Sequence, residues 1–209
     1  MIGPLLRLCL RLSHIHLARV PTTGPAIIAA NHVSMLDGVV LAQAVALRGR
    51  ETRFLVAIEF FRKPLWGWGL RRVDQIPIRR GAKDAGALDE AIATIRAGAL
   101  AGIFPEGHVN LEPFGPLQRG RTGVARIALA AGVPVIPVGI WGTQSRWPRS
   151  GLHFRRPWRP PVTLCFGEPI EPKGDATTRE DLEGFRDHVM EVLERAVAEA
   201  RADTERRAR

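Results

Sequence analysis

The sequence predicts an α/β fold with a mixed, centrally parallel sheet flanked by helices, an N-terminal amphipathic helix and a C-terminal helix. Short apolar runs alternate with segments of helical periodicity, a pattern typical of strands joined by helices. Polar residues follow several of these runs directly, as expected at the carboxyl ends of parallel strands. The 209 residues contain no internal repeat and no linker long enough to separate two large domains.

The N-terminal segment, residues 1–20, is predicted to form an amphipathic helix beside a single domain over residues 21–209. Its apolar positions fall near helical spacing, with the arginines on another face: Ile2, Leu5, Leu6, Cys9 and Leu12 against Arg7 and Arg11. These charges leave no apolar run of membrane-spanning length, so a transmembrane helix or a cleaved signal peptide is not expected. The helix either packs on its own domain or lies in a membrane interface.

Six apolar runs predict strands, over residues 26–30, 54–58, 76–78, 100–104, 135–140 and 162–166. Pro77 weakens the third, because proline cannot donate to a strand ladder. The last run alternates apolar and polar residues, which predicts a half-exposed edge strand.

Helices are predicted between these strands and at the C-terminus. Helical periodicity covers residues 38–47, 82–97 and 123–131, and Gly98 and Gly132 close the second and third. Thr177 and Glu180 form a capping-box pattern before a final long amphipathic helix.

The net charge of +9 comes almost entirely from arginine, since the chain has 30 basic residues and only Lys63, Lys83 and Lys173 are lysines. Arginine suits phosphate and carboxylate groups, so an anionic partner is one interpretation. A genome rich in arginine codons gives the same excess. Two cysteines, Cys9 and Cys165, form neither a disulfide framework nor a zinc site, which favours an intracellular setting.

The first candidate site is the sequence from Asn31 to Asp37, which directly follows the strand over residues 26–30. A histidine at a strand end, here His32, can pair with a carboxylate such as Asp37, which holds one imidazole tautomer and stabilises the imidazolium. A turn at His32 would let the two side chains meet. Alternatively, Ser34 and Asp37 match a helix N-cap with an acidic third residue, and spacing alone favours this second interpretation.

Three further blocks follow apolar runs: Phe104, Pro105, Glu106 and Gly107; the pair Arg80 and Gly81; and the strand that begins at Val133. Taken singly, a carboxylate in a Pro/Gly turn is usually a turn residue. In this order, with N-H-x4-D and F-P-E-G at this separation, the four blocks resemble those of the glycerolipid acyltransferase superfamily, best known for 1-acylglycerol-3-phosphate acyltransferases. The resemblance covers about residues 20–170.

The resemblance implies a set of roles. His32 would be the general base on a lysophospholipid hydroxyl and Asp37 would orient it, while the acceptor pocket would be formed by Arg80, Phe104, Pro105, Glu106, Gly107 and Arg121. The family usually continues F-P-E-G with Thr-Arg-Ser, whereas this chain has His108, Val109 and Asn110, so Arg119 or Arg121 would supply the missing charge. The implied product is phosphatidic acid from 1-acylglycerol 3-phosphate.

The implied co-substrate is acyl-CoA or acyl carrier protein, with no cofactor and no metal. The alternatives are another acceptor, such as glycerol 3-phosphate or a glycolipid, and a non-catalytic basic module that binds lipid or nucleic acid. The arginines are scattered without an RNA-binding or helix-turn-helix signature, so no nucleic-acid partner is expected.

A lipid acceptor predicts peripheral attachment to the cytoplasmic face of an anionic membrane. The predicted membrane-facing residues are Leu5 and Leu6 in the N-terminal helix and Trp66 and Trp68 in a segment that interleaves aromatic and basic residues. The alternative is that these tryptophans pack in the core.

Overall fold

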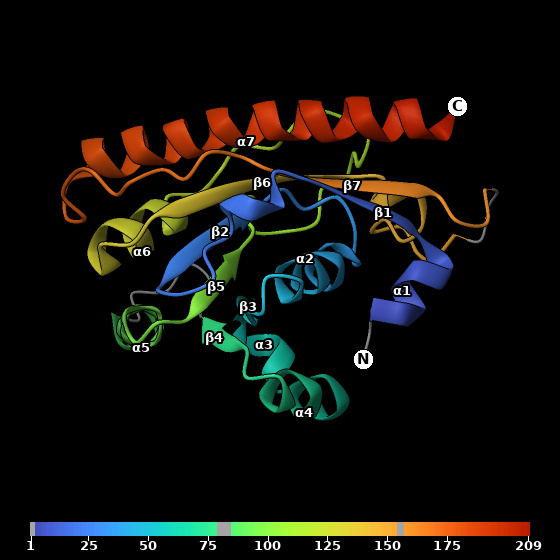
Figure 1. The fold of residues 1–209 in the computed structure, drawn as a ribbon. Coiled ribbons are helices and arrows are strands. Elements are labelled where there is room, and N and C mark those ends of the chain that lie inside the picture. The colour runs from blue at the N-terminus through green and yellow to red at the C-terminus, as the bar shows by residue number, and fades with distance from the viewer. Residues whose placement is uncertain (1–2, 79–84, 154–156) are drawn as a thin grey trace.

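The computed structural model describes residues 3–78, 85–153 and 157–209 (Figure 1). In that part of the chain, seven strands form one sheet in the order β1-β7-β6-β2-β5-β3-β4. Every neighbouring pair is parallel except β6 and β7, which are antiparallel, so the predicted mixed, centrally parallel sheet is confirmed. The strands are β1 (Arg11–Ile15), β2 (Ala26–Ala30), β3 (Thr52–Ala57), β4 (Ile76–Ile78), β5 (Leu100–Ile103), β6 (Val135–Trp141) and β7 (Pro161–Phe166).

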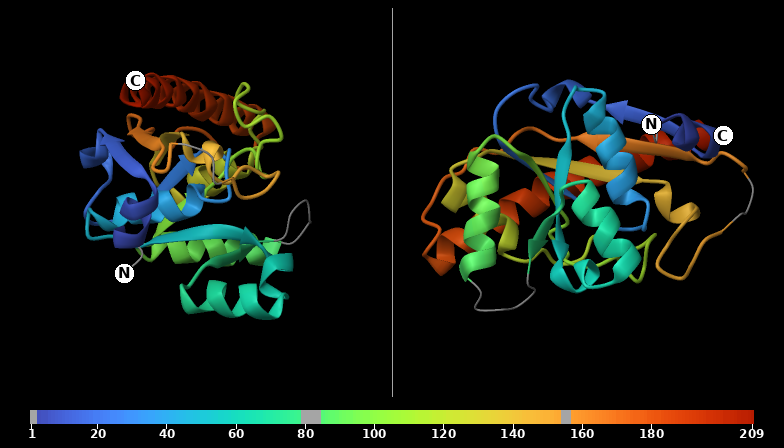
Figure 2. Two further views of the ribbon diagram at one scale, coloured as in Figure 1. Left: turned by 90° about the vertical axis from the view of Figure 1, so that its right-hand side faces the viewer. Right: turned by 90° about the horizontal axis from the view of Figure 1, so that it is seen from below.

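Helices cover both faces of the sheet. The helices of one face are α5 (Ala85–Arg96), α6 (Gly123–Ala131) and α7 (Arg179–Ala208), and those of the other are α1 (Gly3–Cys9) and α2 (Asp37–Ala46). Two further helices, α3 (Ile58–Phe61) and α4 (Pro64–Arg72), follow β3 and lie at the end of the molecule opposite α7 (Figure 2, left).

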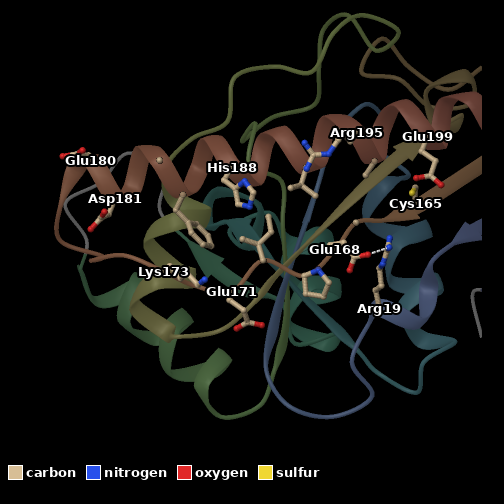
Figure 3. Close-up of a pocket in the computed structure, with 17 residues that line it drawn as sticks. Arg19, Cys165, Glu168, Glu171, Lys173, Glu180, Asp181, His188, Arg195 and Glu199 are labelled. Carbon is tan, nitrogen blue, oxygen red and sulfur yellow. Dashed lines mark hydrogen bonds and ion pairs between the residues drawn. The ribbon is translucent and has the colours of Figure 1, made fainter.

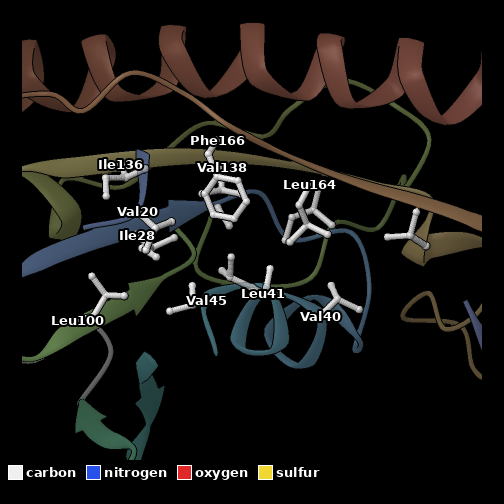
Figure 4. Close-up of a cluster of buried hydrophobic side chains, with 14 of the residues drawn as sticks. Val20, Ile28, Val40, Leu41, Val45, Leu100, Ile136, Val138, Leu164 and Phe166 are labelled. Carbon is white, nitrogen blue, oxygen red and sulfur yellow. The ribbon is translucent and has the colours of Figure 1, made fainter. Parts of the chain in front are cut away.

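The core forms two apolar layers, one on each side of the sheet. On the α2 side, Ile28, Leu41, Val45 and Phe166 are fully buried together (Figure 4). The opposite layer joins the alternate side chains of β2 to α5, α6 and α7. The central strands are therefore buried on both faces, which is why they are continuous apolar runs.

The predicted helix over residues 1–20 is wrong beyond Cys9. After Leu10 the chain enters β1, which pairs with β7 in parallel, and Leu12 packs against the core. Leu6 is buried, so its prediction as membrane-facing is also wrong. The apolar spacing was compatible with one helix, but pairing with a distant strand overrides local periodicity. The side chain of Leu5 lies outside the described residues.

The predicted edge position of residues 162–166 is wrong as well. Strand β7 is buried throughout because β1 pairs with its outer side and α7 packs on one face. The polar position Thr163 is accommodated because its hydroxyl donates to Asp203 Oδ2 of α7 at 2.8 Å. Pro77, by contrast, lies in β4, which is one of the two edge strands of the sheet, and there a missing N–H is tolerated.

Local signals place the other helix ends to within a few residues. Helix α6 has the predicted bounds, and Gly132 ends it with φ of 69°. The N-cap of α7 is Thr178, whose side chain accepts the N–H of Asp181, one residue after the predicted Thr177. Helices α3 and α4 were not predicted. In α4, Gly67 and Gly69 weaken the helical propensity of the segment.

Candidate active site

The turn after β2 is held in place by Asn31, a buried residue at the end of the strand. Its side-chain amide donates to the carbonyl of Ile140 at 3.0 Å, and its side-chain oxygen accepts the Ile140 N–H at 2.7 Å. Asn31 therefore continues the pairing of β2 with β6 after the strand itself has ended. This places His32 at the carboxyl edge of the parallel strands.

The side chains of His32 and Asp37 meet, as the first of the two interpretations of this segment requires. His32 Nδ1 lies 3.0 Å from Asp37 Oδ2, and the same oxygen accepts the backbone N–H groups of Val33 and Ser34, each at 2.7 Å. The Asp37 side chain is fully buried, whereas that of His32 remains 19% exposed. Because Nδ1 is held by the Asp37 carboxylate, Nε2 is the ring nitrogen that remains to accept a proton from a substrate.

The alternative role of this segment, a helix N-cap made by Ser34 and Asp37, is contradicted. Helix α2 begins at Asp37, and its N-cap Leu36 makes no side-chain capping bond. The Asp37 carboxylate points back to the turn instead. The Ser34 hydroxyl accepts the Leu36 N–H and donates to the carbonyl of Trp147.

Thr143 is a site residue that the sequence analysis missed. It is fully buried in the 3-10 turn Thr143–Ser145 after β6, and its hydroxyl donates to Asp37 Oδ1 at 2.6 Å. Strands β2 and β6 are parallel, so the residues that follow them meet at one edge. That rule could have found Thr143, because it is a polar residue just beyond a buried strand.

We expect Thr143→Val to lower kcat about tenfold, with little change in the KM of either substrate. The valine removes one hydrogen bond to a buried carboxylate, and bonds of this kind contribute about 1.5–3 kcal/mol. Thr143→Ser keeps the hydroxyl and should recover most of the activity. Initial rates measured while each substrate is varied separately will check this. Equal activity loss in both variants would show that packing of the γ-methyl, rather than the hydroxyl, supports the site.

Two aromatic rings stack in sequence against the imidazole of His32. The Phe104 ring stacks on the imidazole with centroids 4.0 Å apart, and Phe54 of β3 lies 5.8 Å from Phe104 in a parallel orientation. Gly102 leaves room for Phe54, because a Cβ there would lie 2.5 Å from that ring. The stack fixes the plane of the imidazole, so we assign Phe104 a supporting contact with His32.

Glu106 lies directly beneath the turn and is almost completely buried. Its Oε1 accepts the backbone N–H of His32 at 2.7 Å, and its Oε2 accepts that of Gln118 at 3.3 Å. Burial raises the pKa of the Glu106 carboxyl, and these two N–H groups oppose the rise. The Glu106 carboxylate thus accepts hydrogen bonds from the backbone of two loops, one of which carries His32.

We expect Glu106→Ala to lower the free energy of unfolding by about 1–3 kcal/mol, because the buried N–H of His32 loses its acceptor. Glu106→Gln keeps one oxygen and should lose less. The raised pKa means that the stability contributed by protonated Glu106 is present at low pH and lost as pH rises from 4.5 through the folded-state pKa. Unfolding curves of Glu106→Gln should lack that loss, and an identical pH dependence in both proteins would contradict this.

The loop after Glu106 closes over the turn through residues that were not predicted. The Asn110 N–H donates to the carbonyl of His32 at 2.7 Å, and Asn110 Oδ1 accepts from Gln118 Nε2 at 3.0 Å. Asn110 stands where the family usually has serine, and in this chain it has a structural role at the site.

The other predicted pocket residues are only partly brought together. Gly107 has φ of +78°, and a Cβ there would lie 2.9 Å from Arg121 Nε, so glycine permits the close approach of an exposed arginine. The Arg121 N–H also donates to the carbonyl of Pro105, a buried residue. Arg80 lies outside the described residues.

A groove of about 920 Å³ elsewhere contains none of these residues. It runs along α7 and is lined by charges of both signs, among them the ion pair of Arg19 and Glu168 (Figure 3). Burial, together with Glu199, raises the pKa of the Cys165 thiol in its wall to about 12. Cys165 is therefore a neutral thiol and not an activated nucleophile. Within the described ranges, no group of three or more potential ligands could hold a metal ion.

The chain is similar in sequence to several known proteins. A 1-acyl-sn-glycerol-3-phosphate acyltransferase of Bacillus subtilis is 24% identical over 151 residues, which cover 72% of this chain and 69% of that protein. A chloroplastic 1-acyl-sn-glycerol-3-phosphate acyltransferase of Brassica napus is 28% identical over 122 residues, 57% of this chain and 33% of the relative. An uncharacterized protein of Mycobacterium leprae is 31% identical over 139 residues, 62% of this chain and 36% of the relative. The chain thus spans about a third of the length of these last two relatives.

Among solved structures, the fold is similar to the crystal structure of the 1-acyl-sn-glycerophosphate acyltransferase PlsC from Thermotoga maritima. The TM-score is 0.69 with 28% sequence identity, over 93% of this chain and 74% of that chain. The Acyltransferase family profile matches residues 12–141, from β1 to the end of β6, and so includes His32, Asp37 and Glu106. The chain belongs to the Acyltransferase family.

Proposed function

We propose that this protein transfers a fatty acyl group from a thioester donor to the hydroxyl of a lysophospholipid, 1-acylglycerol 3-phosphate, to give phosphatidic acid. The observation that carries the proposal is the His32–Asp37 pair, with Nδ1 held by a buried carboxylate and the imidazole partly exposed. The family match and the names of the relatives from Bacillus subtilis and Thermotoga maritima support the reaction type.

The pair can perform this transfer as a general base and acid. Nε2 of His32 takes the proton of the acceptor hydroxyl as its oxygen attacks the thioester carbonyl. Asp37 stabilises the imidazolium that forms. When the tetrahedral intermediate collapses, the carbon–sulfur bond breaks, and the imidazolium returns the proton to the departing thiolate. Neither an acyl-enzyme nor a cofactor is needed.

We assign binding of the acceptor phosphate to arginine side chains. Arg121 is exposed, lies beside Gly107 and belongs to the loop that closes over the His32 turn. A planar guanidinium can bind phosphate through two parallel hydrogen bonds. The sequence resemblance adds Arg80 to the same role. Glu106 acts in this scheme by positioning His32 through its backbone rather than by touching the acceptor.

The donor is proposed to be acyl-CoA or acyl carrier protein, and the acceptor is proposed to be met at the cytoplasmic face of a membrane. No described helix is long and apolar enough to cross a bilayer. Access to a lipid acceptor is therefore proposed to occur by attachment to the membrane surface.

A panel of acceptors tests the proposal. Radiolabelled acyl-CoA and acyl carrier protein are each offered with 1-acylglycerol 3-phosphate, other lysophospholipids, glycerol 3-phosphate and a glycolipid, and the lipid products are resolved. We expect labelled phosphatidic acid to dominate. Preferential labelling of glycerol 3-phosphate or a glycolipid would contradict the assigned acceptor while retaining the chemistry of His32.

A further inference from the structure

Helices α3 and α4 occupy the same edge of the sheet as His32. Strand β3 is parallel to β5, which is parallel to β2, so α3 begins where the active-site edge lies. Phe54 of β3 reaches His32 through the Phe104 ring. In Figure 2 (left) α4 forms the end of the molecule farthest from α7. A partner that binds α4 would therefore lie at the same edge of the sheet as His32.

Helix α4 and the residue after it expose large apolar side chains. Leu65 is 80% exposed, Trp68 is 66% exposed, and Val73 is 60% exposed. Leu65 and Trp68 are three residues apart and so share one face of the helix. The alternative of a core position is thus excluded for Trp68, whereas the side chain of Trp66 lies outside the described residues. Adjoining exposed side chains of this size mark an interaction surface.

Basic side chains flank this apolar face, and no acidic residue interrupts it. Arg62, Lys63, Arg71 and Arg72 are all exposed, and residues 60–73 contain neither aspartate nor glutamate. Arg62 and Arg72 form no ion pair within the described part of the chain. The surface carries four positive charges that are available to an anionic partner.

The surface is also preformed. A Cβ on Gly67 would lie 2.0 Å from the carbonyl oxygen of Phe61, so α3 and α4 pack at a distance that only glycine allows. Arg71 Nη1 donates to the same carbonyl at 3.0 Å and ties the two helices together. Binding therefore needs little ordering of this segment.

We propose that the α3–α4 surface, defined by Leu65, Trp68 and Val73 with Arg62, Lys63, Arg71 and Arg72, docks on an anionic phospholipid bilayer. Tryptophan is suited to the membrane interface, and arginine and lysine are attracted to anionic head groups. Met35, in the turn after His32, and Leu111, which follows Asn110, are also exposed apolar residues. The inference rests on the proposed function in one respect, because a lysophospholipid acceptor would lie in that bilayer.

Vesicle co-sedimentation of the full chain tests the charges. We expect binding to phosphatidylcholine vesicles that contain phosphatidylglycerol, weaker binding at high salt, and little binding to phosphatidylcholine alone. The triple variant Arg62→Gln, Lys63→Gln and Arg72→Gln should lower the partition coefficient roughly 100-fold. Arg71 is kept because of its bond to Phe61.

A matched charge control removes three exposed cations elsewhere: Arg126→Gln on α6, Lys173→Gln before α7 and Arg209→Gln at the C-terminus. It has the same net charge as the α3–α4 variant and should bind nearly as well as the unaltered protein. Equal losses in the two variants would overturn the proposal, because only total charge would then matter.

The apolar contribution has its own pair of variants. Trp68→Ala should weaken binding about tenfold, whereas Trp158→Ala, at a tryptophan that is 70% exposed, should not. Binding to neutral vesicles that equals binding to anionic ones would overturn the proposal. So would a dimer that Trp68→Ala dissociates, since the surface would then belong to a second copy of this chain.

The measurement involves no turnover, so its failure differs from failure of the proposed function. His32→Ala protein should bind anionic vesicles as the unaltered protein does. Normal acyl transfer to vesicle lipid by the α3–α4 triple variant would also contradict docking at this surface, while leaving the chemistry of His32 in place.

Discussion

His32→Ala is expected to lower kcat for acyl transfer by about 10²–10⁴-fold, because it removes the proposed general base. The loss should appear with every acyl donor, since the base acts on the acceptor hydroxyl. Steady-state rates with saturating donor and acceptor measure it. The substitution also removes a ring that stacks on Phe104, so the folded state of the variant must be verified by circular dichroism and thermal unfolding.

His188→Ala is the matched control for this prediction. His188 lies on α7 with its side chain 56% exposed and pairs only with Glu191 among the described residues, so its removal should leave kcat unchanged. A folded His32→Ala protein that turns over at the unaltered rate would eliminate His32 as the base.

The second large effect is expected for Asp37→Asn, with kcat again lowered by about 10²–10⁴-fold. The asparagine oxygen can still accept from the backbone of Val33 and Ser34, and its amide can donate to Thr143. The fold should therefore persist, whereas the negative charge that is proposed to stabilise the imidazolium is lost. Asp37→Ala is less informative, because it leaves buried N–H groups without an acceptor.

Asp89→Asn, at an exposed position on α5, provides the matched control and should be fully active. Full activity of Asp37→Asn would show that the carboxylate serves only as a hydrogen-bond acceptor for the turn. Loss of folding in Asp37→Asn would likewise contradict the separation of charge from structure, and thermal unfolding distinguishes this outcome from a purely catalytic loss.

Local patterns predicted most of the central sheet and failed where distant pairing decides. The runs that form β2, β5 and β6 are apolar throughout because both faces are covered. Strand β1 was mistaken for helix because its pairing partner, β7, is about 150 residues away. The polar positions of β7 suggested solvent, but Thr163 meets Asp203 of α7.

For the site, the resemblance to the glycerolipid acyltransferase superfamily identified His32 and Asp37, whereas their spacing alone favoured a helix N-cap. Neither identified the residues that hold the pair. Thr143 and Asn110 come from separate loops that meet at the carboxyl edge of the sheet, so no local pattern joins them to His32. Glu106 was predicted to lie in the acceptor pocket. Its hydrogen bond to the His32 backbone could not be predicted, because that contact depends on how two loops pack.

The proposed function requires direct transfer from the thioester to a lysophospholipid hydroxyl at the His32–Asp37 pair. The most direct measurement follows free thiol and lipid product together, with acyl-CoA and 1-acylglycerol 3-phosphate, for the unaltered and His32→Ala proteins. Direct transfer predicts equimolar CoA and phosphatidic acid, no acyl-protein by intact mass, and loss of both products in His32→Ala. Release of CoA without phosphatidic acid, or an acylated protein that forms in the absence of acceptor, would contradict it.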